Sequence, residues 1–180
     1  MLVIISISLT SFINYVFTIS HIEISVIGFT IFGLVFLLFD KYLWKWGIFY
    51  KIGIIKTPNL NGTWEGTLSS SYHEFKSEMP ACIVIKQTWT HIFISGIFNQ
   101  SKSYSISANL DINNGARTVL RYVYLNKNNL VKSDGTMGEH SGMATLEFTL
   151  DEGELEGKYY NEPPQNVNYG VLKLQKQIKK

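Results

Sequence analysis

The sequence predicts a two-helix transmembrane hairpin followed by an all-β domain, a compact, lipocalin-like, eight-stranded antiparallel up-and-down β-barrel. Three observations predict it. Residues 1–39 contain one acidic residue, Glu23, and neither Lys nor Arg. A short stretch rich in Lys and aromatic residues follows. From residue 58 onward, short runs alternate apolar and polar residues between Gly, Asn, Asp and Ser, as strands joined by turns do. We therefore divide the chain into helices at 1–44, a basic aromatic connector at 45–57 and a β-barrel domain at 58–180.

The first apolar run, 2–20, contains one amide, Asn14. At about 1.5 Å per residue it is just long enough for a hydrocarbon core of about 30 Å. A second run, 24–39, follows after three residues and extends to an interface at 42–44. A cleaved signal peptide is the alternative interpretation of the first run, but the run lacks a basic start and a second apolar run follows at once. The pattern therefore favours two spans joined by a tight turn at 21–23.

Lysines and aromatic residues alternate after the second run, at Lys41, Lys45, Lys51 and Lys56. Positive charge beside an aromatic belt is typical of a cytoplasmic flank, so both termini are expected in the cytosol. Small and hydroxylated residues recur within the two runs, and Asn14 would need a partner in hydrocarbon. Self-association of the helices and a monomeric anchor are both compatible with this pattern.

The β domain is expected to contain eight strands, since eight alternating runs are separated by turn residues. A sheet of this size closes to remove its edges, and eight strands enclose packed side chains or one small ligand. The expected strands are residues 62–72, 79–87, 88–99, 102–112, 117–126, 139–150, 154–161 and 169–175.

The alternation predicts which side chains face inward. In the first strand Trp64 shares a face with Gly62, Gly66 and Leu68, and in the seventh Leu155 shares one with Gly157 and Tyr159. The alternation does not decide the face of 117–125, where arginines and tyrosines lie on opposite sides. In the fourth strand the inward set is expected to be Tyr104, Ile106, Ala108, Leu110 and Ile112.

Composition argues against several functions. Residues 1–56 carry four lysines against two acidic residues, and the rest of the chain carries 12 basic against 12 acidic residues. Without a cationic surplus, binding of DNA or RNA is not expected. Cys82 is the single cysteine, so no intrachain disulfide forms, and no metal site or cofactor is expected. The chain has no catalytic motif, so we do not expect an enzyme.

Aromatic residues and two arginines on strands instead favour a binding function. Tyrosine and tryptophan faces stack on nucleobases, and a guanidinium holds phosphate with two hydrogen bonds. For a nucleotide-sized ligand, the candidates for stacking are Trp64, Tyr104, Tyr122 and Tyr159, and those for phosphate are Arg117 and Arg121. The alternative is that the aromatic residues only pack the barrel core.

The arrangement resembles a known family, the two-transmembrane, β-strand-rich effectors of CBASS, a cyclic-oligonucleotide-based antiphage defence of bacteria. The resemblance covers the whole layout: apolar hairpin, basic aromatic connector, and a barrel that opens with Leu-Asn-Gly-Thr-Trp-Glu-Gly at 60–66 and carries Gly-Lys-Tyr-Tyr at 157–160. The Gly-x-Trp-x-Gly motif also opens lipocalin-like barrels.

The resemblance implies that the barrel senses a cyclic dinucleotide made by a partner nucleotidyltransferase (CD-NTase). Binding would drive homo-oligomerisation, and the two-pass helices would disrupt the bacterial inner membrane and kill the infected cell. Two rival functions stay open: a membrane-tethered lipocalin-like carrier of an apolar ligand, and a structural barrel whose surface binds a protein.

Overall fold

The computed structural model describes residues 1–19, 28–98, 101–112, 117–128, 139–149, 153–162 and 168–177. The described chain forms two compact units, Met1–Ile55 with Thr88–Thr90, and Lys56–Gln87 with His91–Lys180. The turn predicted at 21–23 lies outside the described residues, as do positions 99 and 150 at the ends of two predicted strands.

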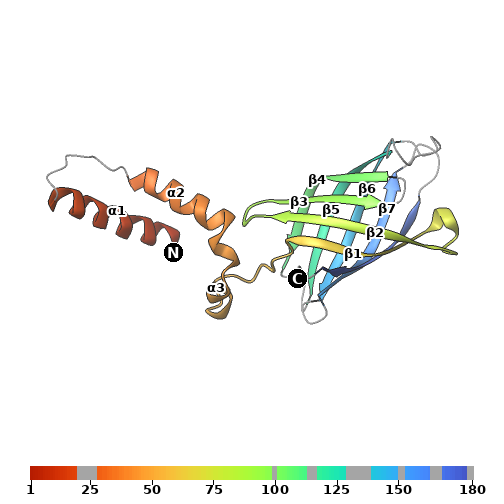
Figure 1. Cartoon of the computed structure of the whole chain (residues 1–180), viewed down its shortest axis with the longest axis horizontal. Coiled ribbons are helices and arrows are strands. Elements are labelled where there is room, and N and C mark those ends of the chain that lie inside the picture. Colours follow the sequence, from red (N-terminus) through yellow and green to blue (C-terminus); the bar gives the residue numbers. More distant parts are fainter. Residues whose placement is uncertain are drawn as a thin grey trace. The chain divides into compact units, whose positions relative to one another are not determined.

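The first unit contains helices α1 (Leu2–Ile19) and α2 (Gly28–Lys41), which lie side by side and antiparallel (Figure 1). Two short helices follow: η1 (Leu43–Lys45), at the end of the region predicted to be helical, and α3 (Gly47–Lys51), in the connector, where no helix was predicted. They form because Phe39, Trp44 and Ile55 bury their side chains in a small apolar cluster. Within the described ranges, no helix combines the length and the apolarity that crossing a bilayer requires.

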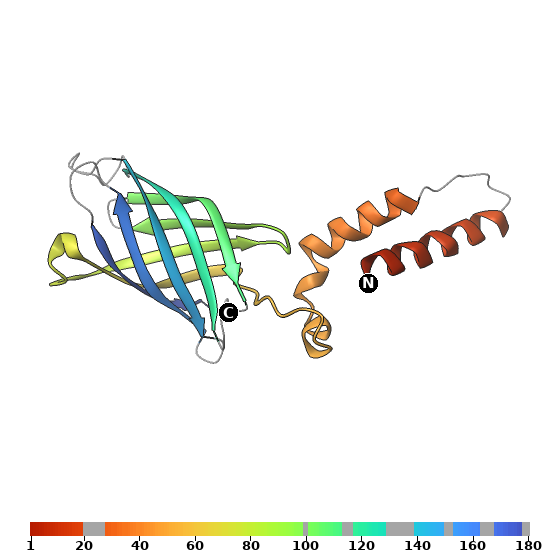
Figure 2. The ribbon, with the colours of Figure 1, turned by 180° about the vertical axis from the view of Figure 1, so that it is seen from behind.

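The second unit is a closed barrel in which each strand pairs antiparallel with the next and the last pairs with the first (Figures 1 and 2). The predicted eight-stranded up-and-down barrel is therefore confirmed. Its strands are β1 (Gly62–Ser70), β2 (Glu78–Gln87), β3 (Ile92–Phe98), β4 (Ser101–Asp111), β5 (Thr118–Asn128), β6 (His140–Thr149), β7 (Glu154–Glu162) and β8 (Tyr169–Lys176).

One end of the barrel is filled by Trp64, as the alternation of β1 predicts. Its side chain is fully buried, its ring meets that of Phe148 edge-on at 5.9 Å, and its Nε1 donates to the Leu60 carbonyl at 2.9 Å. Gln87 holds the same segment, because its Oε1 accepts from the Leu60 amide at 2.8 Å. Lys176 lies over the indole and donates to the Asn59 carbonyl at 2.9 Å. We call this the Trp64 end, made of Leu60, Trp64, Phe148, Leu155 and Leu174.

The predicted inward face of β4 is wrong for two of its residues. Tyr104 and Ile106 are exposed, whereas Ala108 and Leu110 pack against the core. The cause is a β-bulge, since Ser105 pairs with Tyr124 and Ser107 already pairs with Val123. One extra residue in a strand reverses the side-chain alternation beyond it. Alternation alone does not reveal such an insertion.

Candidate functional site

Polar side chains gather at the barrel end opposite Trp64. We call this the polar end and define it by Ser70, Ser101, Ser103, Tyr124, Asn126, His140, Tyr159 and Asn161. Strand pairing brings them together: Ser103 is aligned with Asn126, Asn126 with His140, and Tyr159 with Gly170, which is aligned with Ser70. The three serines and Asn126 are all buried.

Tyr124 occupies the middle of the polar end. Its hydroxyl donates to Asn161 Oδ1 at 2.6 Å, across β6 on strand β7. Gly142, aligned with Tyr124, makes room for the phenol, because a Cβ there would lie 2.5 Å from the tyrosine oxygen and 2.4 Å from the Tyr160 carbonyl. A side chain at position 142 would therefore displace Tyr124 or the β7 backbone.

Tyr159 is placed by a second glycine in the same manner. A Cβ on Gly170 would lie 2.6 Å from the Tyr159 ring, so the ring covers a strand position that carries no side chain. The phenol hydrogen-bonds the Ser70 side chain.

Tyr122 lies between two alanines, because it is aligned with Ala108 on β4 and with Ala144 on β6. Small residues thus alternate with tyrosines across neighbouring strands, as the interior of a small barrel requires.

Asn126 and His140 form the rim of this cluster. The Asn126 Nδ2 lies 3.2 Å from the His140 Nε2, and the ring nitrogen accepts the amide hydrogen in the tautomer that carries its proton on Nδ1. The connection from β1 to β2 lies at the same end, where Glu74 and Phe75 adopt left-handed φ angles of 52° and 57°. Such a conformation is strained for a Phe side chain, and its ring packs at 5.7 Å from Tyr169.

Burial determines the charge state of these groups. It raises the pKa of the Tyr122, Tyr124 and Tyr159 phenols, because the phenolate would lose its hydration. The phenols therefore stay neutral at physiological pH and act as hydrogen-bond donors. Within the described ranges, no Lys, Arg, Asp or Glu side chain is fully buried, and no group of three His, Cys, Asp or Glu side chains could hold a metal ion. The polar end is suited to binding an uncharged, aromatic and hydrogen-bonding part of a ligand.

Residues 55–176, which cover the whole barrel, match the family described as "Cap15, cyclic dinucleotide receptor domain". The chain belongs to this family. The resemblance to CBASS effectors is thereby confirmed. A curated relative, "CD-NTase-associated protein 15" of Staphylococcus schleiferi, is 26% identical over 122 residues, which cover 68% of this chain. The match spans 63% of that relative, less than two thirds of its length.

The predicted site residues fall into three groups according to where they lie in the barrel. Tyr159 is buried at the polar end, and Tyr122 is buried within the barrel next to it. Trp64 is also buried, but at the opposite end. Three residues lie on the outer surface: Tyr104, Arg117 and Arg121.

Both arginines already hold carboxylates. Arg117 pairs with Glu147, and Arg121 lies 3.3 Å from Asp111. The alternation of residues 117–125 did not predict which face points inward. In the structure Leu120, Tyr122 and Tyr124 pack inward, so the two arginines lie on the outside. The predicted phosphate contacts of Arg117 and Arg121 stay predictions.

Sequence reasoning did not find Tyr124, Asn126, His140 or Asn161. A signal was present in the sixth strand, where Gly142 and Ala144 share the inward face with Leu146 and Phe148. Two small residues at consecutive inward positions leave space that side chains of neighbouring strands must fill. That pattern indicates large inward residues on β5 and β7, which are the tyrosines.

Proposed function

We propose that this protein is an antiphage effector whose barrel binds a cyclic dinucleotide from a partner CD-NTase at the polar end. The observation that carries the proposal is the buried, neutral set of hydroxyl and amide groups in a domain of the Cap15 cyclic dinucleotide receptor family. Burying such groups opposes folding unless they are hydrogen-bonded. A cluster of them at one end of a small core is better explained by ligand recognition than by stability.

The chemistry of the polar end matches a nucleobase. An asparagine amide can donate and accept toward a base edge, as Asn126 and Asn161 could, and tyrosine faces stack on bases. We therefore propose Tyr122, Tyr124 and Tyr159 as the aromatic contacts. Of the residues predicted from the sequence, Trp64 and Tyr104 would then have no role in base recognition. Phosphates would face outward from the barrel, where water and exposed cations can neutralise them.

The N-terminal unit supports a membrane role. Large apolar side chains are exposed on α1, among them Ile4, Ile7 and Phe12, and on α2, among them Leu34 and Leu37. Exposed apolar surface of this extent is typical of a lipid or protein contact. We propose that residues 1–44 enter the bacterial inner membrane as a two-pass segment with both termini in the cytosol. Ligand binding would favour an assembled state that disrupts the bilayer, since a ligand shifts an equilibrium toward the state it binds better.

The ligand proposal is tested by thermal unfolding of the full chain with a panel of cyclic di- and trinucleotides, fatty acids and other apolar compounds. A ligand at about 100 times its dissociation constant adds roughly 2.7 kcal/mol of stability, a shift of several degrees. Stabilisation by a cyclic dinucleotide is the expected result. Stabilisation by fatty acids or other apolar compounds alone would favour the lipocalin-like carrier. No shift with any compound would leave the protein-binding barrel.

The membrane proposal is tested separately by flotation of the full chain with vesicles of bacterial lipid. We expect the wild type to float with the vesicles. A double Ile7→Lys, Leu37→Lys variant should float less, because charges in hydrocarbon are unfavourable. A wild type that stays at the bottom of the gradient would contradict membrane insertion.

A further inference from the structure

Among the described residues, the strand pair with the shortest ladder is β3 and β4. Their ladder covers Ser95 to Ile97 of β3 against Lys102 to Tyr104 of β4, whereas β4 and β5 are aligned along the whole of β4. At the bulge β4 turns away from β3, as its green ribbon shows in Figure 2. The Ser105 side chain accepts from the Ile94 amide at 2.9 Å where the backbone ladder stops. Beyond this point, β4 presents an edge on the side opposite β5.

This edge has few of the features that keep sheet edges apart: the bulge at Ser105 and one charge near its end. Natural edge strands carry Lys, Pro or other charges that prevent pairing with a second molecule. The segment after the bulge, residues 107–111, reads Ser-Ala-Asn-Leu-Asp and contains no proline and one charge, Asp111 at the end of β4. Ser107 and Asn109 are exposed, as is Ile106 at the bulge. The edge is therefore open to an added strand.

An exposed apolar patch surrounds the same edge. Ile106 is 67% exposed, Phe93 on β3 is 43% exposed and Val123 on β5 is 37% exposed. Ile97 and Tyr104 extend the patch toward the polar end and are also exposed. An apolar patch and a weakly protected strand edge are independent observations, and both indicate an interaction surface.

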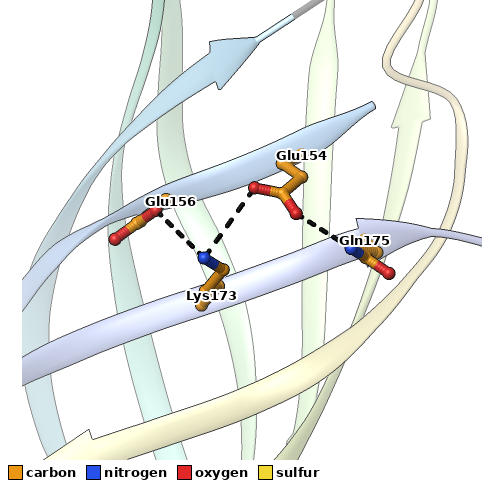
Figure 3. Close-up of polar contacts among 4 residues, drawn as sticks. All are labelled: Glu154, Glu156, Lys173 and Gln175. Carbon is orange, nitrogen blue, oxygen red and sulfur yellow. Dashed lines mark hydrogen bonds and ion pairs between the residues drawn. The ribbon is translucent and has the colours of Figure 1, made fainter. Parts of the chain in front are cut away.

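The junction between β7 and β8 shows the contrast (Figure 3). There Lys173 on β8 lies between Glu154 and Glu156 on β7, at 4.0 and 3.7 Å, and the Gln175 amide donates to Glu154 at 2.8 Å. Strands on both sides flank Gln175, which is aligned with Glu154 on β7 and with Glu65 on β1. Around Gln175 the outer surface is polar and the strand is paired on both sides, so position 175 serves as a matched control for position 109.

We propose that β4 of one copy pairs antiparallel with β4 of a second copy, about a two-fold axis at Asn109. Regular pairing can begin after the bulge, at Ser107, so the paired segment 107–111 is centred on Asn109. In this register Ser107 faces Asp111 and Ala108 faces Leu110, so that no like charges are opposed and a hydroxyl faces each carboxylate. The apolar patches of the two copies would then lie next to the paired strands and could contact each other. A second copy of this chain supplies such a patch, whereas an unrelated partner need not. A closed two-fold dimer follows.

This proposal gives a surface to the self-association within the proposed function. Its test uses the protein without ligand, so that its failure is distinguishable from a failure of cyclic dinucleotide binding. Antiparallel neighbours lie about 4.5 to 5.5 Å apart at Cα, within the range that a disulfide spans. The full chain is made with Cys82→Ser and then Asn109→Cys, or Gln175→Cys as control, and is oxidised mildly. We expect a covalent dimer with the cysteine at 109 and none with the cysteine at 175.

A second variant pair tests the energetics. Asn109→Lys places two lysines opposite each other across the axis and should raise the dissociation constant of the dimer at least tenfold in analytical ultracentrifugation. Gln175→Lys adds the same charge elsewhere and should leave it unchanged. No dimer trapped at 109, equal trapping at both positions, or a mixed disulfide with another protein in place of the dimer would overturn the proposal. An Asn109→Lys variant that dimerises like the wild type would overturn it as well.

Discussion

The two ends of the barrel are made by the same eight strands and are filled in opposite ways. At the Trp64 end, apolar side chains pack on the indole. The Leu60 backbone is held there by hydrogen bonds to the side chains of Gln87 and Trp64. At the polar end, the hydroxyls of Tyr124 and Tyr159 hydrogen-bond the side chains of Asn161 and Ser70 inside the barrel. Apolar packing is the more stable way to fill a core. The difference indicates that the Trp64 end maintains the fold and that the polar end serves recognition.

The largest expected effect is at the Trp64 end. Trp64→Ala removes a fully buried side chain and its hydrogen bond to Leu60, so we expect a loss of about 3–5 kcal/mol in the free energy of unfolding. Urea denaturation measures it. Trp46 is exposed in the other unit, so Trp46→Ala is the control and should leave barrel stability unchanged. A loss below about 0.5 kcal/mol for Trp64→Ala would contradict the assigned role of this end, because surface substitutions reach that size.

A glycine tests the polar end. Gly142→Ala introduces a Cβ 2.4 Å from the Tyr160 carbonyl and 2.5 Å from the Tyr124 oxygen. We expect a destabilisation of about 1–3 kcal/mol by overpacking, with weaker ligand binding because Tyr124 must move. Gly33→Ala is the control, since a Cβ there meets nothing within 4 Å. Unchanged stability and binding in Gly142→Ala would mean that Tyr124 is not tightly held.

Alkaline pH should test, without a ligand, whether burial holds the inner phenols neutral. Burial raises the pKa of Tyr122 in the folded state, whereas the unfolded phenol ionises near pH 10. Above that pH the unfolded state binds fewer protons, so stability is complete below pH 10 and falls as pH rises further. Each such phenol contributes up to about 1.4 kcal/mol per pH unit.

Tyr122→Phe should therefore flatten the decline of unfolding free energy between pH 10 and 11. Tyr72→Phe, at an exposed tyrosine, should leave the decline as in the wild type. Equal slopes in wild type and Tyr122→Phe would contradict a phenol held neutral by burial.

The smallest effect is expected at the outer surface of β5. Arg117 and Arg121 form exposed or half-exposed ion pairs with Glu147 and Asp111, and such pairs contribute about 0–1 kcal/mol. If the ligand binds at the polar end, Arg117→Ala and Arg121→Ala should leave its dissociation constant unchanged. A tenfold loss in either variant would instead support the phosphate contacts predicted from the sequence.

The sequence predicted the parts of this contrast that depend on local alternation. Eight alternating runs predicted eight strands, and the first and seventh placed Trp64, Leu155 and Tyr159 correctly inside. The same rule failed in β4 because of the bulge after Ser105. One extra residue in a strand cannot be recognised from the apolar-polar pattern alone. The hydrogen bond from Tyr124 to Asn161 joins strands that are not neighbours, so it depends on two successive strand registers. Such a contact follows from the assembled barrel and cannot be predicted from any single strand.

The most direct test of the account is a calorimetric titration of the full chain with the cyclic dinucleotide that stabilises it. Two variants are compared, one for each end. Tyr124→Phe removes the hydroxyl that holds Asn161, and Lys176→Met removes the cation over Trp64 while keeping most of the side-chain volume. We predict that Tyr124→Phe weakens binding about tenfold, roughly 1.4 kcal/mol, and that Lys176→Met leaves it unchanged. Loss of binding in Lys176→Met with wild-type affinity in Tyr124→Phe would contradict the assignment of the ligand to the polar end.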